Sequence, residues 1–227
     1  MNLTAVIVSM FLVIFLFSGC STNREESYLL AQKGSSYLNL LKNNELTKEQ
    51  ASQLSYSVVQ VSLNDGHKIL MPLGYLEAGH QQWFSKDLFS FTTKNGRIVQ
   101  IYHTDEEISA IERIDFYKNV NLQTIKPKQN FSFIVEIDFL TQKRFGVKAF
   151  LTIRVVGTEE RLLWGEPVSL LRIEEHVYIP SMNFEFTNLY WKDAQTNFIW
   201  ESRQKWGPDA LTIHYKVLKP WREVREP

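Results

Sequence analysis

From residue 56 onward, apolar and polar residues alternate with a period of two, which is typical of β-strands that bury one face. Two stretches show the alternation most clearly, with apolar residues at Phe131, Phe133, Val135, Ile137, Phe139, Val147, Ala149, Leu151, Ile153 and Val155. The intervening positions include Ser132, Glu136, Asp138, Lys148, Thr152 and Arg154. We therefore expect one face of this strand pair to pack on a core and the other to meet water or a partner.

Two turn pairs, Asp65-Gly66 and Asn95-Gly96, divide the alternating residues into hairpins, and the second pair tolerates positive φ at both central turn positions. Residues 105–115 have helical spacing and are interpreted as a helix or a loop. The strands predicted from the period of two cover residues 59–63, 68–73, 88–93, 97–102, 131–139, 147–155, 161–164, 168–178, 184–191, 197–202 and 211–217.

Ten or more strands joined by short turns predict a mainly β fold, an antiparallel meander that forms a barrel-like or sandwich sheet. One or two short helices are expected before the sheet. Thr22-x-x-Glu25 and Thr47-x-x-Gln50 both have the form of a capping box, in which each side chain accepts a hydrogen bond from the backbone amide of the other residue.

The N-terminus has a different pattern, because residues 3–17 are almost entirely apolar and are followed at once by Ser18, Gly19 and Cys20. About fifteen apolar residues suit a secretory signal peptide and fall short of the roughly 20 that span a bilayer. Cys20 is the only cysteine, which excludes an internal disulfide, and its thiol is placed to accept a diacylglyceryl group before cleavage. The alternative is an ordinary membrane helix or a buried helix with an incidental cysteine.

These signals divide the chain into three parts. We expect a lipoprotein signal peptide at 1–19, a lipidated tether with a helical segment at 20–55, and a single β-rich domain at 56–227. Ser21, rather than Asp, follows the lipidated cysteine, which favours sorting to the outer membrane, with the protein facing the periplasm.

The charge balance and the motifs of the chain argue against several classes of function. The chain carries 25 Lys plus Arg and 25 Asp plus Glu, so nothing in its charge indicates a nucleic-acid partner. It has no Gly-x-Ser-x-Gly, phosphate-binding loop or Gly-x-Gly-x-x-Gly motif. We therefore expect no catalytic residue, no metal and no cofactor. The histidines show no metal-ligand spacing and are interpreted as scattered surface residues: His67, His80, His103, His176 and His214.

Two groups of acidic residues are catalytic candidates. Asp87 and Asp193 form a glycosidase pair only if the fold brings their carboxylates within roughly 5 to 10 Å. Glu174, Glu175 and His176 are consecutive, and neighbours on a strand point to opposite faces, so we interpret them as a solvated strand rather than an acid–base cluster.

The tryptophans, together with nearby charged residues, are the candidate contacts for a sugar or a partner protein. The six tryptophans either stack on sugar rings or fill the core, and the core is the favoured interpretation. The candidate contact residues are Trp83, Asp87, Arg97 and Trp191. Arg97 is expected to pair with Asp87 or Asp193.

Several short segments, in their order along the chain, resemble the YjbF/GfcB family of capsule and exopolysaccharide lipoproteins. Those in the first half are LNDGHKI at 63–69, LGYLE at 73–77, WFSKD at 83–87 and TKNGRIV at 93–99. Those near the C-terminus are NLYWKD at 188–193, WESRQ at 200–204 and LKP at 218–220. Asn197 departs from the family pattern, which has Gly there, but Asn is the next best residue at a left-handed turn position.

The resemblance implies a non-enzymatic accessory lipoprotein of capsule or exopolysaccharide production and export. It would be held in the outer membrane through lipid on Cys20 and would work with an outer-membrane β-barrel protein of the same system. The polysaccharide itself is a further candidate partner. A docking protein of this kind should have one exposed apolar or aromatic patch. The alternatives are a periplasmic carbohydrate-binding module, which would have an open groove lined by Trp, and a polysaccharide hydrolase or lyase.

Overall fold

The computed structural model describes residues 46–86, 89–102, 111–112, 121–139, 142–205, 207–208 and 210–221. They belong to a unit that covers residues 38–227. The predicted signal peptide, Cys20 and the first predicted helix lie outside the described residues, as does most of the segment at 105–115. Within the described ranges, no helix is both long enough and apolar enough to cross a membrane.

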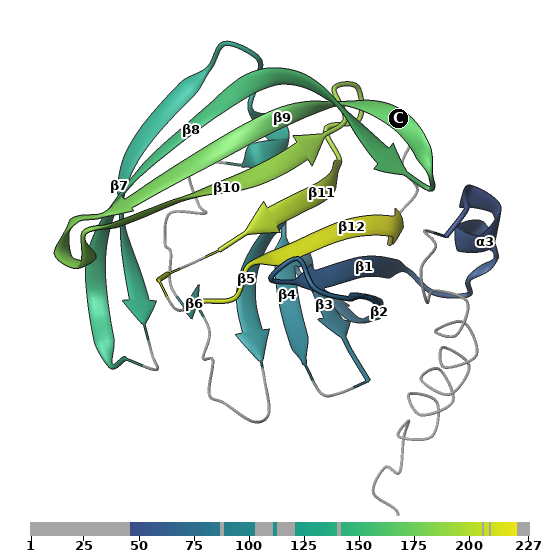
Figure 1. The fold of residues 1–227 in the computed structure, drawn as a ribbon, viewed down its shortest axis with the longest axis horizontal. Coiled ribbons are helices and arrows are strands. Elements are labelled where there is room, and N and C mark those ends of the chain that lie inside the picture. The colour runs from purple at the N-terminus through teal and green to yellow at the C-terminus, as the bar shows by residue number, and fades with distance from the viewer. Residues whose placement is uncertain are drawn as a thin grey trace, which may run out of the picture. The chain divides into compact units, whose positions relative to one another are not determined.

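Within the described ranges, twelve antiparallel strands form one sheet, in the order β5-β4-β3-β2-β1-β12-β11-β10-β9-β8-β7-β6 (Figure 1). The strands are β1 (Val58–Leu63), β2 (Lys68–Glu77), β3 (His80–Phe84), β4 (Ser90–Lys94), β5 (Arg97–Tyr102), β6 (Ile111–Glu112), β7 (Asn130–Phe139), β8 (Arg144–Leu163), β9 (Glu166–Ile179), β10 (Phe184–Lys192), β11 (Ile199–Gln204) and β12 (Ile213–Lys219). The helical elements are α3 (Lys48–Gln53), η3 (Leu122–Thr124) and η4 (Pro180–Met182). The predicted mainly β fold and antiparallel meander are confirmed.

The sheet bends within β2. Residues 68–72 of this strand pair with β1, whereas Leu73–Glu77 pair with β3, and the register shifts around Gly74. Glycine is needed there because a Cβ would lie 2.5 Å from the ring of Phe84. The ring therefore packs directly over the backbone at the bend.

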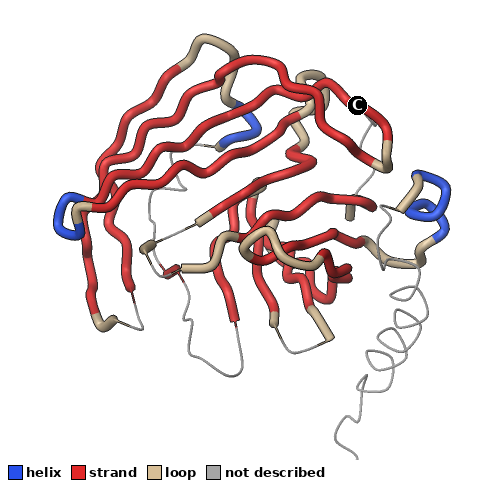
Figure 2. The backbone as a smooth tube through the Cα atoms, in the orientation of Figure 1, coloured by secondary structure: helices blue, strands red, loops and turns tan. Residues whose placement is uncertain are grey.

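The sheet curls but does not close. Its two edge strands, β5 and β6, come within 8 Å of each other between Cα atoms, yet they are not paired in the described ladder. The β4–β5 turn has the predicted left-handed backbone at Asn95 and Gly96 and lies against β11, where the Gln204 amide donates to the Gly96 carbonyl at 2.9 Å. Figure 2 shows the resulting arrangement, with the long strands β7–β10 arching over the shorter ones.

Strands β7 and β8 bury alternate residues as the sequence predicted, with Val135, Ile137, Ala149, Leu151 and Ile153 on the buried face. The sequence placed two strands at 147–155 and 161–164, but the structure joins them into one strand of 20 residues. The strand continues across a β-bulge at Gly157, where the register with β9 shifts by one residue. Strands β8 and β9 are then joined by a tight turn in which Trp164 and Gly165 both have positive φ.

The far end of the β8–β9 hairpin crosses strand β12. The Trp164 indole donates to the Leu218 carbonyl at 2.9 Å, and the Lys216 ammonium donates to the Leu162 carbonyl at 3.0 Å. Lys216 and Leu218 are accordingly both buried.

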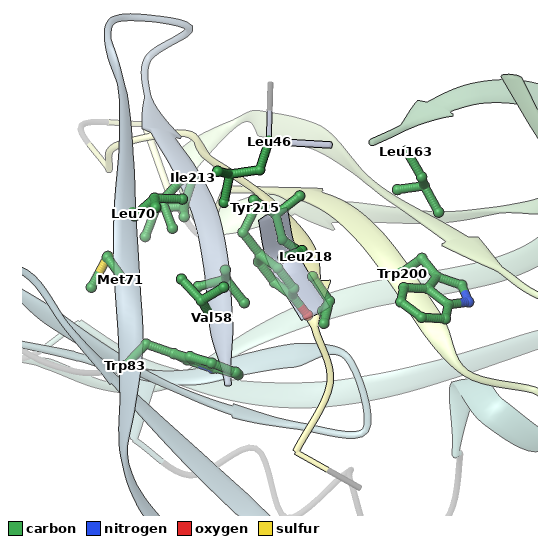
Figure 3. Close-up of a cluster of buried hydrophobic side chains, with 14 of the residues drawn as sticks. Leu46, Val58, Leu70, Met71, Trp83, Leu163, Trp200, Ile213, Tyr215 and Leu218 are labelled. Atoms are coloured by element: carbon green, nitrogen blue, oxygen red, sulfur yellow. The ribbon is translucent and has the colours of Figure 1, made fainter. Parts of the chain in front are cut away.

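Two apolar clusters result from this folding. One lies between β1–β5, β12 and the end of the β8–β9 hairpin, and Figure 3 shows Trp83, Tyr215 and Trp200 within it. The other lies on the inner face of β7–β10 and contains Val135, Leu151 and Ile173. Burial of apolar surface in these clusters is the main stabilising term of the domain.

Helix α3 begins with the predicted capping box. The Gln50 amide donates to the Thr47 hydroxyl at 3.3 Å, and the Thr47 amide donates to the Gln50 side chain at 2.9 Å. We expect Thr47→Ala to lower the free energy of unfolding by about 1 kcal/mol, because it leaves a helix-terminal donor without its partner. Urea titration monitored by tryptophan fluorescence measures the change. Ser52→Ala, on an exposed position of the same helix, is the control, and an equal loss there would contradict the capping role.

Candidate functional site

Strand β3 carries Trp83, the first of the predicted contact residues. Its side chain is fully buried, its indole donates to the Thr93 hydroxyl at 3.0 Å, and its ring meets that of Trp221 edge-on at 5.7 Å between centroids. Trp83 therefore presents no open ring face to a sugar. Asp87, four residues further along, lies outside the described residues.

Trp191, at the end of β10, is also buried. The Arg161 guanidinium, from the returning end of β8, lies over its ring at 4.2 Å from the centroid. Such a cation–π contact stabilises both groups and occupies the ring face that a sugar would need.

Arg97 is paired differently from the sequence expectation. Its Nε and Nη2 atoms donate to Oε2 of Glu175 at 2.9 and 2.6 Å, and the two side chains are only 2% and 6% exposed. The expected pairing with Asp87 or Asp193 is wrong for Asp193, whose carboxylate instead accepts hydrogen bonds from Gln195 and Thr196 in the following turn. The interpretation of Glu175 as part of a solvated strand is also wrong, because its face of β9 points inward.

We call Arg97, Glu175, Asn188, Tyr190 and Gln204 the inner polar cluster. Glu175 Oε1 accepts hydrogen bonds from the Tyr190 hydroxyl at 3.0 Å and from the Asn188 amide at 3.2 Å. Gln204 accepts from the Ile98 amide at 3.0 Å, so the cluster links β9, β10 and β11 to the edge strand β5. Since the partners come from four strands, the cluster ties the edge strand β5 to the inner face of β9–β11.

Next to the inner polar cluster, the backbone of Gly96 packs closely against Ile199. Its φ is +85°, and a Cβ would lie 2.9 Å or less from atoms of Ile199. The buried Tyr215 hydroxyl donates to the Gly96 carbonyl at 2.8 Å, and burial raises the pKa of this phenol, so Tyr215 remains a donor. The Asn-Gly turn is therefore both a hairpin signal and a contact with the opposite part of the sheet.

The second charged group lies on the other face of β11 and centres on Glu201. This carboxylate has no exposed side-chain surface, and it accepts hydrogen bonds from Arg161 and, at 2.5 Å, from the ring of His214. Burial alone raises the pKa of Glu201, but the hydrogen bonds from His214 and Arg161 and the charge of Lys216 outweigh it and lower the pKa to about 2. We call Glu201, Arg161, His214 and Lys216 the Glu201 cluster.

From Glu201 a chain of ion pairs runs outward over β8 and β9. The pairs are Arg161–Glu159 at 3.1 Å, Glu159–Arg172 at 3.4 Å, Arg172–Glu174 at 2.5 Å and Glu174–Arg154 at 2.7 Å. Burial alone raises the pKa of Glu174. The hydrogen bond from Arg154 and the charge of Arg172 have the larger combined effect, so the pKa of Glu174 lies below its ordinary value. Alternating charges therefore tie the two strands together on either side of the bulge at Gly157.

The segment NLYWKD at 188–193 also has a structural role, through Lys192 and the turn after Asp193. The Lys192 ammonium donates to the carbonyls of Gln123 at 3.1 Å and Ile125 at 2.5 Å, and burial lowers its pKa. Asn197, which closes the turn after Asp193, has φ +60°, so the predicted left-handed position is confirmed.

The buried carboxylates of these two clusters are suited to a structural role rather than to proton transfer. Glu175 and Glu201 are both held by arginines as hydrogen-bond acceptors and have little or no exposed surface. Among the described residues, no group of three or more His, Cys, Asp and Glu is placed to hold a metal ion. His214, which the sequence placed on the surface, belongs to the Glu201 cluster, and no local sequence signal indicated this pairing.

An exposed apolar row crosses the outer face of β7, β8 and β9. Ile134, Phe150 and Tyr178 lie directly opposite one another in the ladder and are 65%, 49% and 37% exposed. The rings of Phe150 and Tyr178 stack at 6.5 Å between centroids. We call these three residues the apolar row. The sequence contained its signal, because Ile134 and Phe150 interrupt the otherwise polar face of the strands.

Comparisons with known proteins agree with the fold. The chain is 25% identical over 218 residues to the "Uncharacterized lipoprotein GfcB" of Escherichia coli (strain K12), which covers 95% of this chain and 98% of that protein. The crystal structure of the hypothetical lipoprotein YmcC from Escherichia coli (K12) superposes with a TM-score of 0.64 at 23% identity, over 83% of this chain and 96% of that one.

The family model described as "Group 4 capsule polysaccharide lipoprotein gfcB, YjbF" matches residues 27–218. This range includes α3, every described strand up to Leu218 in β12, and both charged clusters. The resemblance first seen in the order of short motifs thus extends over most of the chain, which belongs to the YjbF/GfcB family of group 4 capsule polysaccharide lipoproteins.

Proposed function

We propose that the protein is a non-enzymatic accessory factor in capsule or exopolysaccharide production and export, anchored by lipid on Cys20 in the outer membrane and facing the periplasm. Its partner in this proposal is the outer-membrane β-barrel protein of the same export system. The match to the capsule polysaccharide lipoprotein family over residues 27–218 carries the proposal.

The charged side chains of the domain support a non-enzymatic role. Glu175 and Glu201 are locked by Arg97 and Arg161, and Asp193 caps a turn. A glycosidase needs two carboxylates that can reach a sugar, one of them able to deliver a proton. Carboxylates that are buried and held by arginines do not meet this need, so a polysaccharide hydrolase is the less favoured alternative.

The carbohydrate-binding alternative is less favoured too. It requires tryptophan faces open along a groove. Trp83, Trp191 and Trp200 are buried, and the faces of the first two are covered by other side chains.

The anchoring part of the proposal is tested by two variants of the full-length chain. Cys20→Ala removes the lipid-bearing thiol, whereas Ser21→Asp keeps the thiol and changes the residue that directs sorting. We expect wild type in the outer-membrane fraction of a density gradient, Cys20→Ala retained as an uncleaved precursor, and Ser21→Asp lipidated but shifted to the inner membrane. Secreted polymer should fall in both variants. Full secretion by the Cys20→Ala strain would contradict the proposal.

The barrel partner and the absence of hydrolase activity are tested by two separate measurements. Pull-down of the acylated wild-type protein should recover an outer-membrane barrel protein that the Cys20→Ala form does not recover. Incubation of the purified protein with the exported polymer should leave the number of reducing ends unchanged. A steady release of reducing ends would replace the accessory role with a hydrolase.

A further inference from the structure

The outer face of strands β7–β10 is a regular surface. The four strands lie side by side in the arch of Figure 1, and their ladder has no register shift within residues 130–137 of β7 or 147–155 of β8. The opposite face of the same strands packs on the apolar cluster that contains Val135, Leu151 and Val177. Packing from beneath therefore holds the outer side chains at the even spacing of the ladder.

A row of hydrogen-bonding side chains runs beside the apolar row. On each strand it lies two residues away from the apolar row, so the two rows share one face. Its members lie opposite one another in the ladder and are all exposed: Ser132 on β7, Thr152 on β8, His176 on β9 and Thr187 on β10. We call these four residues the polar row.

The polar row has hydrogen-bonding capacity beyond its internal contacts. The hydroxyls of Ser132 and Thr152 are 3.4 Å apart, and the Thr187 hydroxyl lies 3.3 Å from Nδ1 of His176. A hydroxyl can donate one hydrogen bond and accept two. One long contact uses only part of this capacity, so each hydroxyl can also bind a ligand.

The charges around the two rows are mixed in sign. On one side Lys148 lies opposite Glu136, and on the other Arg154 is paired with Glu174 at 2.7 Å. Glu185 lies on β10 at the end of the apolar row. Because the signs are interspersed, the face does not favour a strongly charged ligand. A face for anionic lipid headgroups would instead be rich in Lys and Arg.

These features fit a neutral sugar chain. A pyranose ring has an apolar face of C–H groups and a rim of hydroxyls, so it binds where an apolar surface lies beside hydrogen-bonding groups. The apolar row offers the rings of Phe150 and Tyr178, whose planes differ by 23°. The polar row lies about 7 Å away along the strands. Neighbouring strands are about 4.8 Å apart, close to the length of one sugar unit, so a chain running across them repeats the same contacts.

We propose that the outer face of β7–β10 binds a neutral stretch of polysaccharide, which runs across the strands with its sugar rings on the apolar row and its hydroxyls on the polar row. This rests on the proposed function, because the ligand is taken to be the polymer whose export the protein assists. The site is a sheet face with Phe150 and Tyr178 exposed, and it does not use the buried tryptophans.

Substitutions of two phenylalanines on β8 test the stacking. The acylated full-length protein, extracted in detergent, is titrated over polymer purified from the culture medium and immobilised on a sensor surface. Phe150→Ile keeps an apolar, strand-forming side chain but removes the ring, so the Kd for the polymer should rise roughly tenfold. Phe145→Ile is the matched control, because Phe145 is 64% exposed on the same strand but lies outside both rows. Its Kd should equal that of wild type.

A second pair of variants tests the hydrogen bonds. Thr152→Val removes a hydroxyl of the polar row and keeps the shape of the side chain, so the Kd should rise about fivefold. Thr158→Val, at an exposed position of the same strand outside the polar row, should leave the Kd unchanged. Urea titration of each variant shows that it is folded. Equal or tighter binding of polymer by Thr152→Val would overturn the proposal, because a purely apolar contact gains from the added methyl group.

Other occupants of the face give different results. If wild type did not bind the polymer, or if Phe150→Ile bound it as tightly as wild type, the proposal would be overturned. If Phe150→Ile lost the barrel protein in the pull-down but kept its affinity for the polymer, the face would be a protein-docking surface instead. Tenfold weaker binding of wild type at high salt would indicate an ionic ligand and overturn the neutral-sugar assignment.

The Cys20→Ala strain separates this proposal from the proposed function. Reduced secretion by that strain, together with unchanged polymer binding by Phe150→Ile, would support the export role and overturn the sugar site. Full secretion by that strain, together with roughly tenfold weaker binding by Phe150→Ile, would support the sugar site and overturn the export role.

Discussion

Arg97→Met should lower the free energy of unfolding by about 3 to 5 kcal/mol, because it leaves the Glu175 carboxylate charged and buried without its main partner. The guanidinium donates to Glu175 through Nε and Nη2, and both side chains are almost fully buried. Tyr190 and Asn188 would remain as donors, but neither carries a positive charge.

The adjacent glutamate provides the control for this experiment. Arg154 donates to Glu174 through the same two atoms, at 3.0 and 2.7 Å, but the Arg154 side chain is 62% exposed. Arg154→Met should therefore cost less than about 1 kcal/mol, as exposed ion pairs do. Urea titration monitored by tryptophan fluorescence gives both values.

A double substitution separates the cost of the orphaned charge from the loss of packing. Arg97→Met combined with Glu175→Gln removes both charges, so much of the lost stability should return. A single Arg97→Met that costs no more than Arg154→Met would show that the inner polar cluster does not hold the curled sheet.

The sequence was informative where a signal was local. Alternation in 131–139 and 147–155, the Asn-Gly turn at 95–96 and the capping box at Thr47 were all confirmed, since each depends on residues close together in the chain. The turn after β1 was shifted by one residue, because Asn64 and Asp65, rather than Gly66, adopt positive φ.

Strand β3 was missed for a physical reason. Its buried positions are Gln81 and Trp83, and Gln81 is a polar residue whose side chain accepts a hydrogen bond from the Thr93 hydroxyl at 3.0 Å. A buried amide that is satisfied in this way breaks the apolar period on which strand prediction relies.

The charged clusters could not be predicted, because their partners are distant in sequence. Arg97 and Glu175 are 78 residues apart, and Arg161 and Glu201 are 40 apart. Which arginine meets which glutamate depends on the curl of the sheet and on the bulge at Gly157. The alternation of apolar and polar residues along a strand predicts neither the curl nor the bulge.

Acid should destabilise the protein through Glu201 more than through any exposed carboxylate. The pKa of Glu201 falls from its usual 4.5 to about 2 in the folded protein, so the folded state holds this group ionised where the unfolded state binds a proton. A lowered folded pKa contributes stability that is complete above pH 4.5 and is lost as pH falls toward 2. The shift corresponds to about 3 kcal/mol.

The measurement compares wild type with Glu201→Gln by urea titration between pH 7 and pH 2. At pH 7 the variant should be less stable by about 3 kcal/mol or more, because Arg161, His214 and Lys216 lose the negative charge among them. The difference should shrink as pH falls below 4.5, since the wild-type carboxylate then loses its advantage.

Glu159→Gln is the matched control, because Glu159 pairs with the same arginine but is partly exposed. It should follow the wild-type pH profile, with a loss below about 1 kcal/mol. If the gap between wild type and Glu201→Gln stayed constant down to pH 2, the stabilising term at Glu201 would be packing rather than charge. In that case the ion pairs that run from Glu201 to Arg154 would not account for the joining of β8 and β9 to β11.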